Sequence, residues 1–337
     1  MMGKRWIAIG LSAAVGAFGL SACGSSDDNS GGSSTGSNAS SGSSGGKRYN
    51  MTLITGVKGD EFYITMGCGA QAEAAKQGVN LNIQGPDEFD ASQQTPIVNA
   101  VAAKRPDAVL IAPTDSKALF APIQQLSSGG AKIVLVDTTL DQPDMAVSQI
   151  SSDNVAGGTQ AAKALVELIG SGGGKVAVVN VKPGISTTDQ RAQGFQAGVK
   201  GTSLQYVGQQ FDDDDPAKAA SITKSLLAKN PDLKGIFATN VLTAEGVASG
   251  LREAGKKGVK VVTFDAGPKN VEDLKQGLIQ GLIAQQPADI GKQGIDQAVA
   301  ALKGQPTTKK ITTGFVTVTK DNLDSPEAQA ALYKASC

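Results

Sequence analysis

Residues 107–137, "DAVLIAPTDSKALFAPIQQLSSGGAKIVLVD", contain the pattern that decides the fold. Two short apolar runs, at 107–112 and 132–137, flank a segment whose spacing fits a helix closed by glycines. Strands that are apolar almost throughout are typical of parallel sheets, because helices cover both faces of such sheets. The stretch therefore predicts a strand–helix–strand unit of an α/β fold.

The same alternation continues on both sides of this unit. Further strands are predicted upstream, and beyond residue 153 the pattern of helix and strand begins again; the predicted strands lie at 51–55, 79–84, 175–181, 204–209, 235–239 and 259–264. The chain has 337 residues, of which about 290 can form a globule, enough for two domains of ordinary size. We therefore expect two doubly wound parallel-sheet lobes with a cleft between them.

Residues 1–22 are typical of a bacterial export signal. Lys4 and Arg5 form a positive start, and residues 6–20 form an apolar run of about 15 residues, short of the ~20 that a spanning helix needs. The sequence "LSACG" at 20–24 looks like a lipoprotein lipobox, which predicts lipidation of Cys23. A plain cleaved signal with an incidental cysteine is the alternative.

Residues 23–47 predict a flexible linker. Almost every residue there is Ser, Gly, Asn, Asp or Thr, so the segment has too little apolar surface to offset the entropy of ordering it. We therefore expect a body tethered to the outer face of the cell membrane, or a periplasmic one, whose contact with the membrane is through the lipid anchor only.

The composition excludes several classes of function. Lys and Arg together number 31, as do Asp and Glu, which argues against a nucleic-acid partner. The chain has no histidine, and this removes the commonest general base, most zinc sites and any Ser-His-Asp triad. We expect no cofactor and no metal.

Two cysteines remain for the exported body once Cys23 is assigned to lipid. An oxidising compartment favours a disulfide between Cys68 and Cys337, which would fix the C-terminal tail. One buried thiol and one thiol at a frayed terminus are the alternative.

Polar and aromatic residues follow the predicted strands. Open parallel sheets bind ligands beyond the carboxyl ends of their strands, so these residues are candidates for one site. They include Phe62 and Tyr63, Asp137 and Thr138, the segment 186–191, Asn240, Asp265 and Gln285. Carboxylates and amides can bind neighbouring hydroxyls, and an aromatic face can cover the C–H side of a sugar ring.

At these residues the chain resembles the ribose-type periplasmic sugar-binding proteins, the type I solute-binding proteins of ABC importers. The resemblance covers about residues 48–319, and its strongest motifs are "APTDSKAL" (112–119), "ISSDNVAGG" (150–158), "DQRAQGF" (189–195), "VVTFDAGP" (261–268) and "IAQQPADIGKQG" (283–294). It implies two lobes joined by a three-strand hinge, with crossings near Ser151, Gln285 and Gly314. The implied division is an N-terminal lobe of 48–151 plus 286–313, a C-terminal lobe of 152–285 plus 314–319, and a tail of 320–337.

The resemblance also implies a ligand set: Asp60, Phe62, Tyr63, Asp137, Thr138, Asp189, Arg191, Asp214, Asn240, Asp265 and Gln285. Several positions depart from the pattern of ribose binders. Asp60 stands where they have asparagine, Thr138 and Asp189 where they usually have arginines, and Asp214 at an aromatic position. Val241 replaces an aspartate. Ribose itself is therefore disfavoured, and we expect another neutral sugar or a polyol; a cationic ligand remains open because the pocket would be acidic.

Each candidate also has a purely structural interpretation. Phe62 and Tyr63 could be core, Asp137 and Asp265 could be caps or turns, and Arg191 could pair with Asp189.

Three further motifs are given structural roles. Asp153 is expected to cap a helix. The run Asp212–Asp215 is expected to be a solvated turn and helix start rather than a calcium loop, with only Asp214 a site candidate. "GSGGGKV" (170–176) precedes its strand, so a phosphate loop is rejected.

These observations predict an extracytoplasmic solute-binding lipoprotein. A monomer would capture a small sugar or polyol by closure of its hinged lobes and deliver it to an ABC transporter permease, without acting as an enzyme. The alternatives are an exported carbohydrate-active enzyme, since paired carboxylates can do acid–base chemistry, and a binding subunit for sugar signalling.

Overall fold

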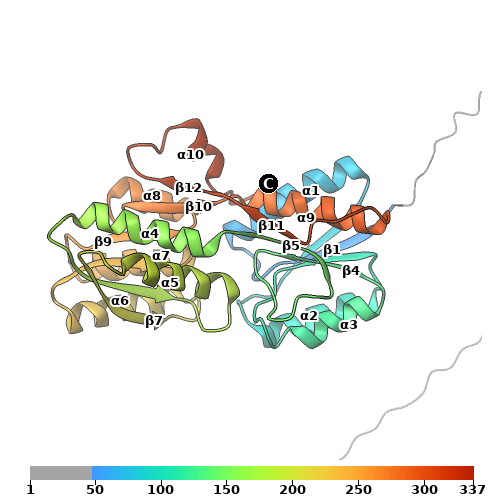
Figure 1. The fold of residues 1–337 in the computed structure, drawn as a ribbon, viewed down its shortest axis with the longest axis horizontal. Helices are drawn as coiled ribbons and strands as arrows, with labels where there is room; N and C mark the ends of the chain where they lie inside the picture. The colour runs from blue at the N-terminus through green and yellow to red at the C-terminus, as the bar shows by residue number, and fades with distance from the viewer. Residues whose placement is uncertain (1–47) are drawn as a thin grey trace, which may run out of the picture. The chain divides into compact units, whose positions relative to one another are not determined.

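Two six-stranded sheets organise residues 48–337, the part of the chain that the computed structural model describes. Helices cover both faces of each sheet (Figure 1). The predicted α/β fold of two doubly wound lobes is confirmed. The expectations for the export signal, for lipidation of Cys23 and for the linker lie outside the described residues.

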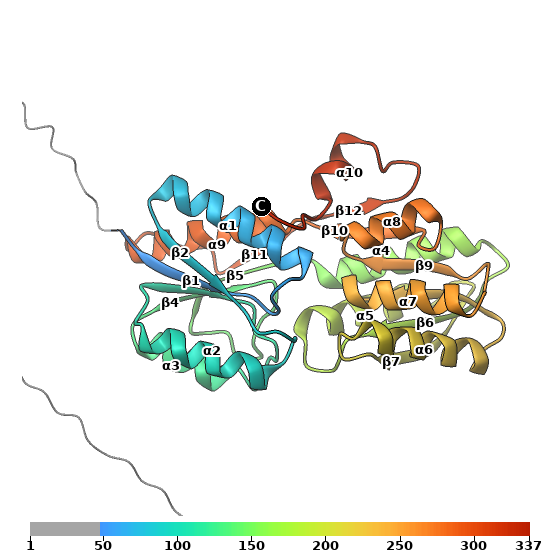
Figure 2. The same ribbon diagram turned by 180° about the vertical axis from the view of Figure 1, so that it is seen from behind.

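The first sheet has the strand order β11-β5-β4-β3-β1-β2, and all of its pairings are parallel. Its strands are β1 (Asn50–Ile54), β2 (Asn80–Gln84), β3 (Ala108–Ile111), β4 (Lys132–Val136), β5 (Ala146–Ser152) and β11 (Lys310–Thr313). On one face lie α1 (Glu61–Gln77) and α9 (Pro287–Leu302), and on the other α2 (Ala91–Ala103) and α3 (Phe120–Ser128) (Figures 1 and 2). We call these elements lobe 1.

The second sheet has the order β12-β10-β9-β8-β6-β7, in which only β12 runs antiparallel to its neighbour. Its strands are β6 (Gly174–Asn180), β7 (Leu204–Phe211), β8 (Leu233–Ala238), β9 (Lys260–Phe264), β10 (Gly281–Gln285) and β12 (Phe315–Val318). One face carries α4 (Asn154–Ile169) and α5 (Ser186–Val199); the other carries α6 (Pro216–Lys229), α7 (Val241–Glu253) and α8 (Pro268–Gln276) (Figures 1 and 2). We call these elements lobe 2.

The chain passes between the two sheets three times. It leaves the first sheet after β5, returns to lobe 1 after β10, and leaves again between β11 and β12. The last passage is short, because only Gly314 separates β11 from β12. Beyond β12, the C-terminal tail (residues 320–337) contains the short helix α10 (Pro326–Ala331).

Local sequence explains several helix boundaries. Asp153 caps α4 as expected, because its carboxylate accepts the backbone N–H of Ala156. In contrast, α3 begins only at Phe120, partway along the segment between β3 and β4 whose spacing fits a helix. The Asp115 carboxylate accepts the N–H groups of Lys117 and Ala118, and this turn occupies the first expected helical positions.

Glycines bring α4 and α5 into backbone contact. A Cβ on Gly158 would lie 2.0 Å from the carbonyl oxygen of Arg191, and one on Gly194 would lie 2.1 Å from that of Val155. Neither helix could keep its place with a side chain at these positions. This close approach fixes the first turns of α5, from which Arg191 extends.

The C-terminal tail is attached to lobe 1 by a disulfide. Cys337 is bonded to Cys68 of α1, with 5.4 Å between their Cα atoms, so the expected pairing is confirmed. No helix within residues 48–337 is both long and apolar enough to cross a membrane.

Candidate functional site

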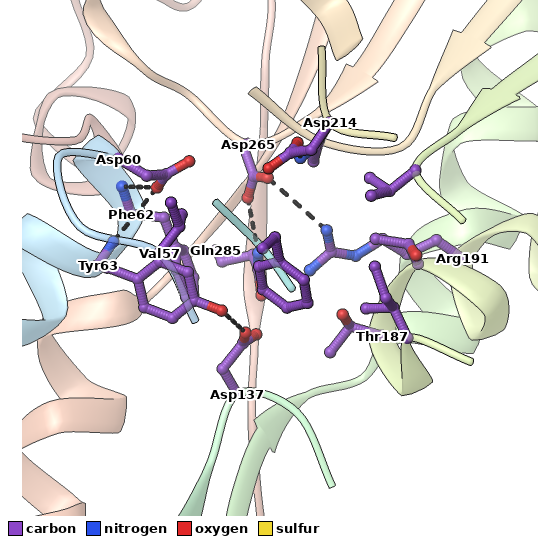
Figure 3. A pocket seen from close by; sticks show the side chains of 15 residues that line it. Val57, Asp60, Phe62, Tyr63, Asp137, Thr187, Arg191, Asp214, Asp265 and Gln285 are labelled. Carbon is purple, nitrogen blue, oxygen red and sulfur yellow. Dashed lines mark hydrogen bonds and ion pairs between the residues drawn. The ribbon is translucent and has the colours of Figure 1, made fainter. Parts of the chain in front are cut away.

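A cavity lies where the carboxyl ends of the strands of the two lobes face each other (Figure 3). Its empty volume is about 420 Å³, a figure that includes space open to solvent. Its walls are formed by Val57, Asp60, Phe62, Tyr63, Phe89, Asp137, Val181, Ile185, Thr187, Thr188, Arg191, Asp214, Asn240, Asp265 and Gln285.

All but two of the site residues expected from the sequence line this cavity. Thr138 and Asp189 lie elsewhere. The Thr138 hydroxyl donates to the carbonyl oxygen of Pro113, and the Asp189 carboxylate accepts the backbone N–H of Gly184. Both side chains therefore support loops beside the cavity, and we leave them out of the ligand set.

Thr187 and Thr188 lie in the candidate segment 186–191 but were not singled out, and four further lining residues were not among the candidates: Val57, Phe89, Val181 and Ile185. These four are apolar and follow β1, β2 or β6. These residues lie beyond strand ends, where sites are expected to form. The aliphatic ones were missed because the sequence was searched for polar and aromatic residues.

The lobe 1 wall combines aromatic rings with two carboxyl groups. Tyr63 donates its hydroxyl to Asp137 Oδ2 at 2.7 Å, and Asp60 caps α1 by accepting the N–H of Phe62 (Figure 3). Asp137 follows β4 with a φ of 62°, a left-handed conformation that aspartate tolerates. Phe62 and Tyr63 are also part of the core, so their structural and site interpretations both hold.

The aromatic rings of this wall pack closely. Tyr63 stacks on Phe89 with ring centroids 6.5 Å apart, and Phe62 meets Tyr63 edge-on at 5.1 Å. Gly56 leaves room for them, because a Cβ there would lie 2.4 Å from the Tyr63 hydroxyl and 2.3 Å from the Phe89 ring. The glycine after β1 therefore determines how close the two rings come.

The lobe 2 wall is organised around Asp265, which follows β9 with a φ of 78°. Its Oδ1 accepts from Gln285 Nε2 at 2.6 Å and from the Tyr333 hydroxyl at 2.7 Å. Its Oδ2 lies 3.7 Å from Arg191 Nη1, and both side chains are almost fully buried (Figure 3). Arg191 therefore pairs with Asp265 rather than with Asp189.

Arg191 is held by groups other than this carboxylate as well. Its Nε donates to Asn154 and its Nη1 to the carbonyl oxygen of Thr239, while its guanidinium carbon lies 3.9 Å from the centre of the Phe264 ring. Two of its five N–H donors thus form hydrogen bonds within the protein, and its charge is paired with Asp265. A negatively charged ligand would have little free cation to bind.

The acidic run 212–215 is a turn and helix start as expected, with Asp213 and Asp215 exposed, but it is not solvated throughout. Asp212 is fully buried, and its Oδ1 accepts the backbone N–H of Asp214. Asp214 lines the cavity and accepts from Asn240 Nδ2 at 2.6 Å, while Asp215 caps α6. The turn closes inward because both Asp213 and Asp214 adopt positive φ. Among residues 48–337, no group of acidic side chains and cysteines has the arrangement of a metal site.

Burial makes three carboxyl groups of the cavity, those of Asp60, Asp137 and Asp214, hard to ionise. Burial raises the pKa of Asp137 to about 6, although the charge of Arg191 and the hydrogen bond from Tyr63 both lower it. It raises the pKa of Asp214 to about 7, and that of Asp60 well above its usual range, with the charges of Asp214 and Asp265 adding to the effect on Asp60. Near neutral pH Asp214 is therefore partly protonated and can donate as well as accept hydrogen bonds.

Two buried polar atoms of the wall have no hydrogen-bond partner. They are Oε1 of Gln285 and Oγ1 of Thr188. Because buried polar groups are nearly always paired in folded proteins, a polar ligand is the natural partner for both.

The loop between β6 and α5 holds the two lobes together around the cavity. Lys182 Nζ donates to the carbonyl oxygen of Phe89 at 2.6 Å, and the Ser186 hydroxyl accepts the N–H of Thr139 at 2.9 Å. The Ser116 N–H donates to the carbonyl oxygen of Gly184 at 3.1 Å. Since each contact joins lobe 2 to lobe 1, the structure describes the closed form.

Two α/β lobes connected by three crossings, with a polar cavity at the facing strand ends, define a solute-binding protein of the type I periplasmic class. The comparison with known families agrees. The chain belongs to the periplasmic binding protein family, whose domain matches residues 51–306, and to its ribose-type branch.

Curated relatives cover most of the chain. It is 31% identical over 265 residues to the ribose import binding protein RbsB of Bacillus subtilis, covering 79% of this chain and 85% of the relative. It is 30% identical over 251 residues to the D-allose-binding periplasmic protein of Escherichia coli, covering 72% and 81%. These relatives are sugar-binding transport proteins and not enzymes, and their family is extracytoplasmic.

Solved structures are similar over the whole body. An ABC transporter solute-binding protein from Agrobacterium vitis, bound with α-D-tagatopyranose, is 42% identical with a TM-score of 0.83, covering 85% of this chain and 100% of that one. A second protein from the same organism, with bound D-fucose, is 31% identical with a TM-score of 0.80, covering 84% and 100%.

Proposed function

We propose that this protein is an extracytoplasmic lipoprotein that captures a neutral monosaccharide between its lobes and delivers it to an ABC transporter permease. One observation carries the proposal: the cavity joins Asp137 of lobe 1 and Asp265 of lobe 2 around unpartnered polar atoms. A hydroxyl-rich ring can bond to both walls at once, and it then stabilises the closed form.

The charges of the wall favour a neutral ligand rich in hydroxyls. Four carboxyl groups line the cavity, from Asp60, Asp137, Asp214 and Asp265, and its single arginine is already paired. A sugar acid or a sugar phosphate would place its charge among these acids with no free cation. Hydroxyl groups instead offer the donors that carboxylates accept, and the Tyr63 and Phe89 rings supply an apolar surface for ring C–H groups.

The size of the cavity favours a single sugar unit. Its empty space is only about 420 Å³ even with open solvent included, and the contacts of Lys182 and Ser186 close its edge. The relative bound with α-D-tagatopyranose makes D-tagatose the first candidate, in its pyranose form. We assign ligand contacts to Asp60, Phe62, Tyr63, Asp137, Arg191, Asp214, Asn240, Asp265 and Gln285.

Titration calorimetry tests this proposal directly. The panel contains D-tagatose, D-fucose, D-arabinose, D-ribose and D-allose, with D-glucose 6-phosphate as the charged comparison. We expect a neutral sugar to bind with a stoichiometry of one and to be recovered unchanged, and the phosphate to bind at least a hundredfold more weakly. No binding across the neutral sugars, or preference for the phosphate, would contradict the proposal.

Anchoring and delivery rest on the sequence of the N-terminal segment. The lipobox-like residues 20–24 and the polar residues after them support a body tethered to the outer face of the membrane. Expression of the full chain and of Cys23→Ser, followed by fractionation, tests the anchor. The parent should sediment with membranes, whereas the variant should remain in the soluble exported fraction. Equal distribution of the two would overturn lipidation.

A further inference from the structure

The C-terminal tail contacts residues that line the binding cavity, although it lies beyond the family match, which ends at residue 306. From α10 beside β12, the tail runs to a terminus next to α1 (Figures 1 and 2). On this path Tyr333 becomes buried, with 5% of its surface exposed. It does not line the cavity itself.

Tyr333 forms hydrogen bonds with Asp265 and Gln285, two residues of the lobe 2 wall of the cavity. Its hydroxyl donates to Asp265 Oδ1 at 2.7 Å and accepts the backbone N–H of Gln285 at 3.0 Å. Its own backbone N–H donates to the carbonyl oxygen of Ala266 at 3.1 Å. The hydroxyl is thus fully used, as a donor to one wall residue and an acceptor from another.

The residues around Tyr333 bind lobe 1. The Lys334 N–H donates to the Thr65 hydroxyl at 2.8 Å, the Tyr333 ring meets the Phe62 ring edge-on at 5.8 Å, and Cys337 is bonded to Cys68. The last five residues therefore contact both lobes, and the disulfide fixes the end of the chain four residues after the tyrosine.

We propose that Tyr333 is a positioning residue for the sugar site and that the Cys68–Cys337 disulfide holds it in place. The proposal rests on the proposed function. Asp265 occupies a left-handed backbone position after β9. Because Tyr333 and Gln285 together occupy Oδ1, the carboxylate is oriented with Oδ2 toward Arg191 and the cavity. A ligand hydroxyl then meets an acceptor that is already in place.

Removal of one hydroxyl tests this role. In Tyr333→Phe the ring stays in the core while Asp265 Oδ1 loses one donor and the Gln285 N–H loses its acceptor. The loss of a hydrogen bond to a charged group, or a buried polar group left unpaired, costs a free energy that corresponds to about a ten- to hundredfold loss of affinity. We expect calorimetry with D-tagatose to show a loss of this size. Tyr206→Phe, which removes a hydroxyl from β7 away from the cavity, should bind like the parent.

Amide hydrogen exchange provides a measurement that needs no sugar. In the parent the Gln285 N–H is buried and bonded to the Tyr333 hydroxyl, so it should exchange slowly. In ligand-free Tyr333→Phe it should exchange at least tenfold faster, and in Tyr206→Phe it should be unchanged. A purely structural tail would leave both this rate and the affinity unaltered.

The role of the disulfide is tested by a cycle of variants. If the bond acts by holding Tyr333, then Cys68→Ser with Cys337→Ser should weaken D-tagatose binding. Adding Tyr333→Phe to that pair should weaken binding by less than the product of the separate losses. Independent, multiplicative losses would overturn the link between the disulfide and the tyrosine.

The two proposals fail in distinguishable ways. If the parent binds none of the neutral sugars, the proposed function is wrong, and the Gln285 exchange rate still decides whether Tyr333 orders this wall. If the parent binds D-tagatose and Tyr333→Phe binds it equally well, the proposed function stands and the positioning role is overturned.

Discussion

The ammonium group of Lys182 lies 2.6 Å from the backbone carbonyl oxygen of Phe89, across the boundary between the two lobes. The same group lies 3.5 Å from Asp90 Oδ2. Around this contact is a second hollow whose walls bring together acidic residues of both lobes: Asp87, Glu88, Asp90, Asp213, Asp214 and Asp215. Closure therefore gathers like charges, and Lys182 is placed to offset their repulsion.

Replacement of this lysine should speed the release of ligand. In Lys182→Met the closed form loses a hydrogen bond and a partly exposed ion pair, together worth about 1 kcal/mol, so the dissociation rate should rise about fivefold. Stopped-flow measurement with D-tagatose checks this. Lys175→Met is the matched control, because Lys175 pairs with Asp232 at 3.0 Å within lobe 2. An unchanged dissociation rate in Lys182→Met would show that the contact does not stabilise closure.

The buried carboxyl of Asp137 should make the ligand-free protein less stable as the pH rises. Its pKa is about 6 in the folded protein and about 3.9 in an unfolded chain, so between these values only the folded state keeps the proton. Stability from this group is fully present below pH 4 and is lost as the pH passes 6, on the order of 2–3 kcal/mol in total. Arg191, Tyr63 and Asp265 are the groups that act on this carboxyl.

Urea unfolding between pH 4 and 7.5 measures this contribution. Asp137→Asn keeps the left-handed backbone position and should show a shallower fall in the free energy of unfolding than the parent. Asp144→Asn changes an exposed carboxylate of lobe 1 and should follow the parent. Parallel curves for the parent and Asp137→Asn would mean that Asp137 ionises normally.

The carboxylate of Asp265 should matter more for affinity than that of Asp189. Both were candidates from the sequence, but only Asp265 lines the cavity and pairs with Arg191. Asp265→Asn leaves the buried guanidinium without its charged partner, and we expect about a hundredfold loss in D-tagatose affinity. Asp189→Asn can still accept the Gly184 N–H and should bind within about twofold of the parent. Equal losses in the two variants would contradict the placement of the site.

A methyl group at Gly56 should disturb the aromatic wall. The added Cβ of Gly56→Ala would lie within 2.4 Å of Tyr63 and Phe89 atoms, so the rings must move. Displacement of packed rings in a core typically costs about 1–3 kcal/mol, and we expect a tenfold or greater loss of affinity. Gly172→Ala, in an exposed turn with nothing within 4 Å of the new atom, should leave calorimetric binding unchanged. Normal binding by Gly56→Ala would show that this aromatic wall is not part of the binding site.

The strands missed by sequence analysis lie at the hinge side of each sheet. Continuous apolar runs such as β3 and β4 were recognised because both faces of these strands are buried. β5 alternates buried and half-buried residues, and β11 and β12 are four residues long with few buried positions. Such segments resemble connecting loops until their partners are known.

Most lining residues could be predicted because the site follows from topology. Parallel strands of one sheet end at the same edge, so Asp137, Asn240 and Asp265 had to come together once the strands were recognised. The roles of Arg191 and Asp212 could not be predicted, since they depend on backbone turns and partners far away in sequence. Tyr333 was missed because it acts from a tail that follows the last strand of the sheets.

The central claim is that a neutral monosaccharide binds between Asp137 of lobe 1 and Asp265 of lobe 2. A crystal structure of the protein grown with D-tagatose tests it most directly. We predict one sugar ring in the cleft, with hydroxyls within 3.2 Å of both carboxylates and of Gln285 Oε1. Clear density for the sugar at another surface, with the cleft free of it, would contradict this account.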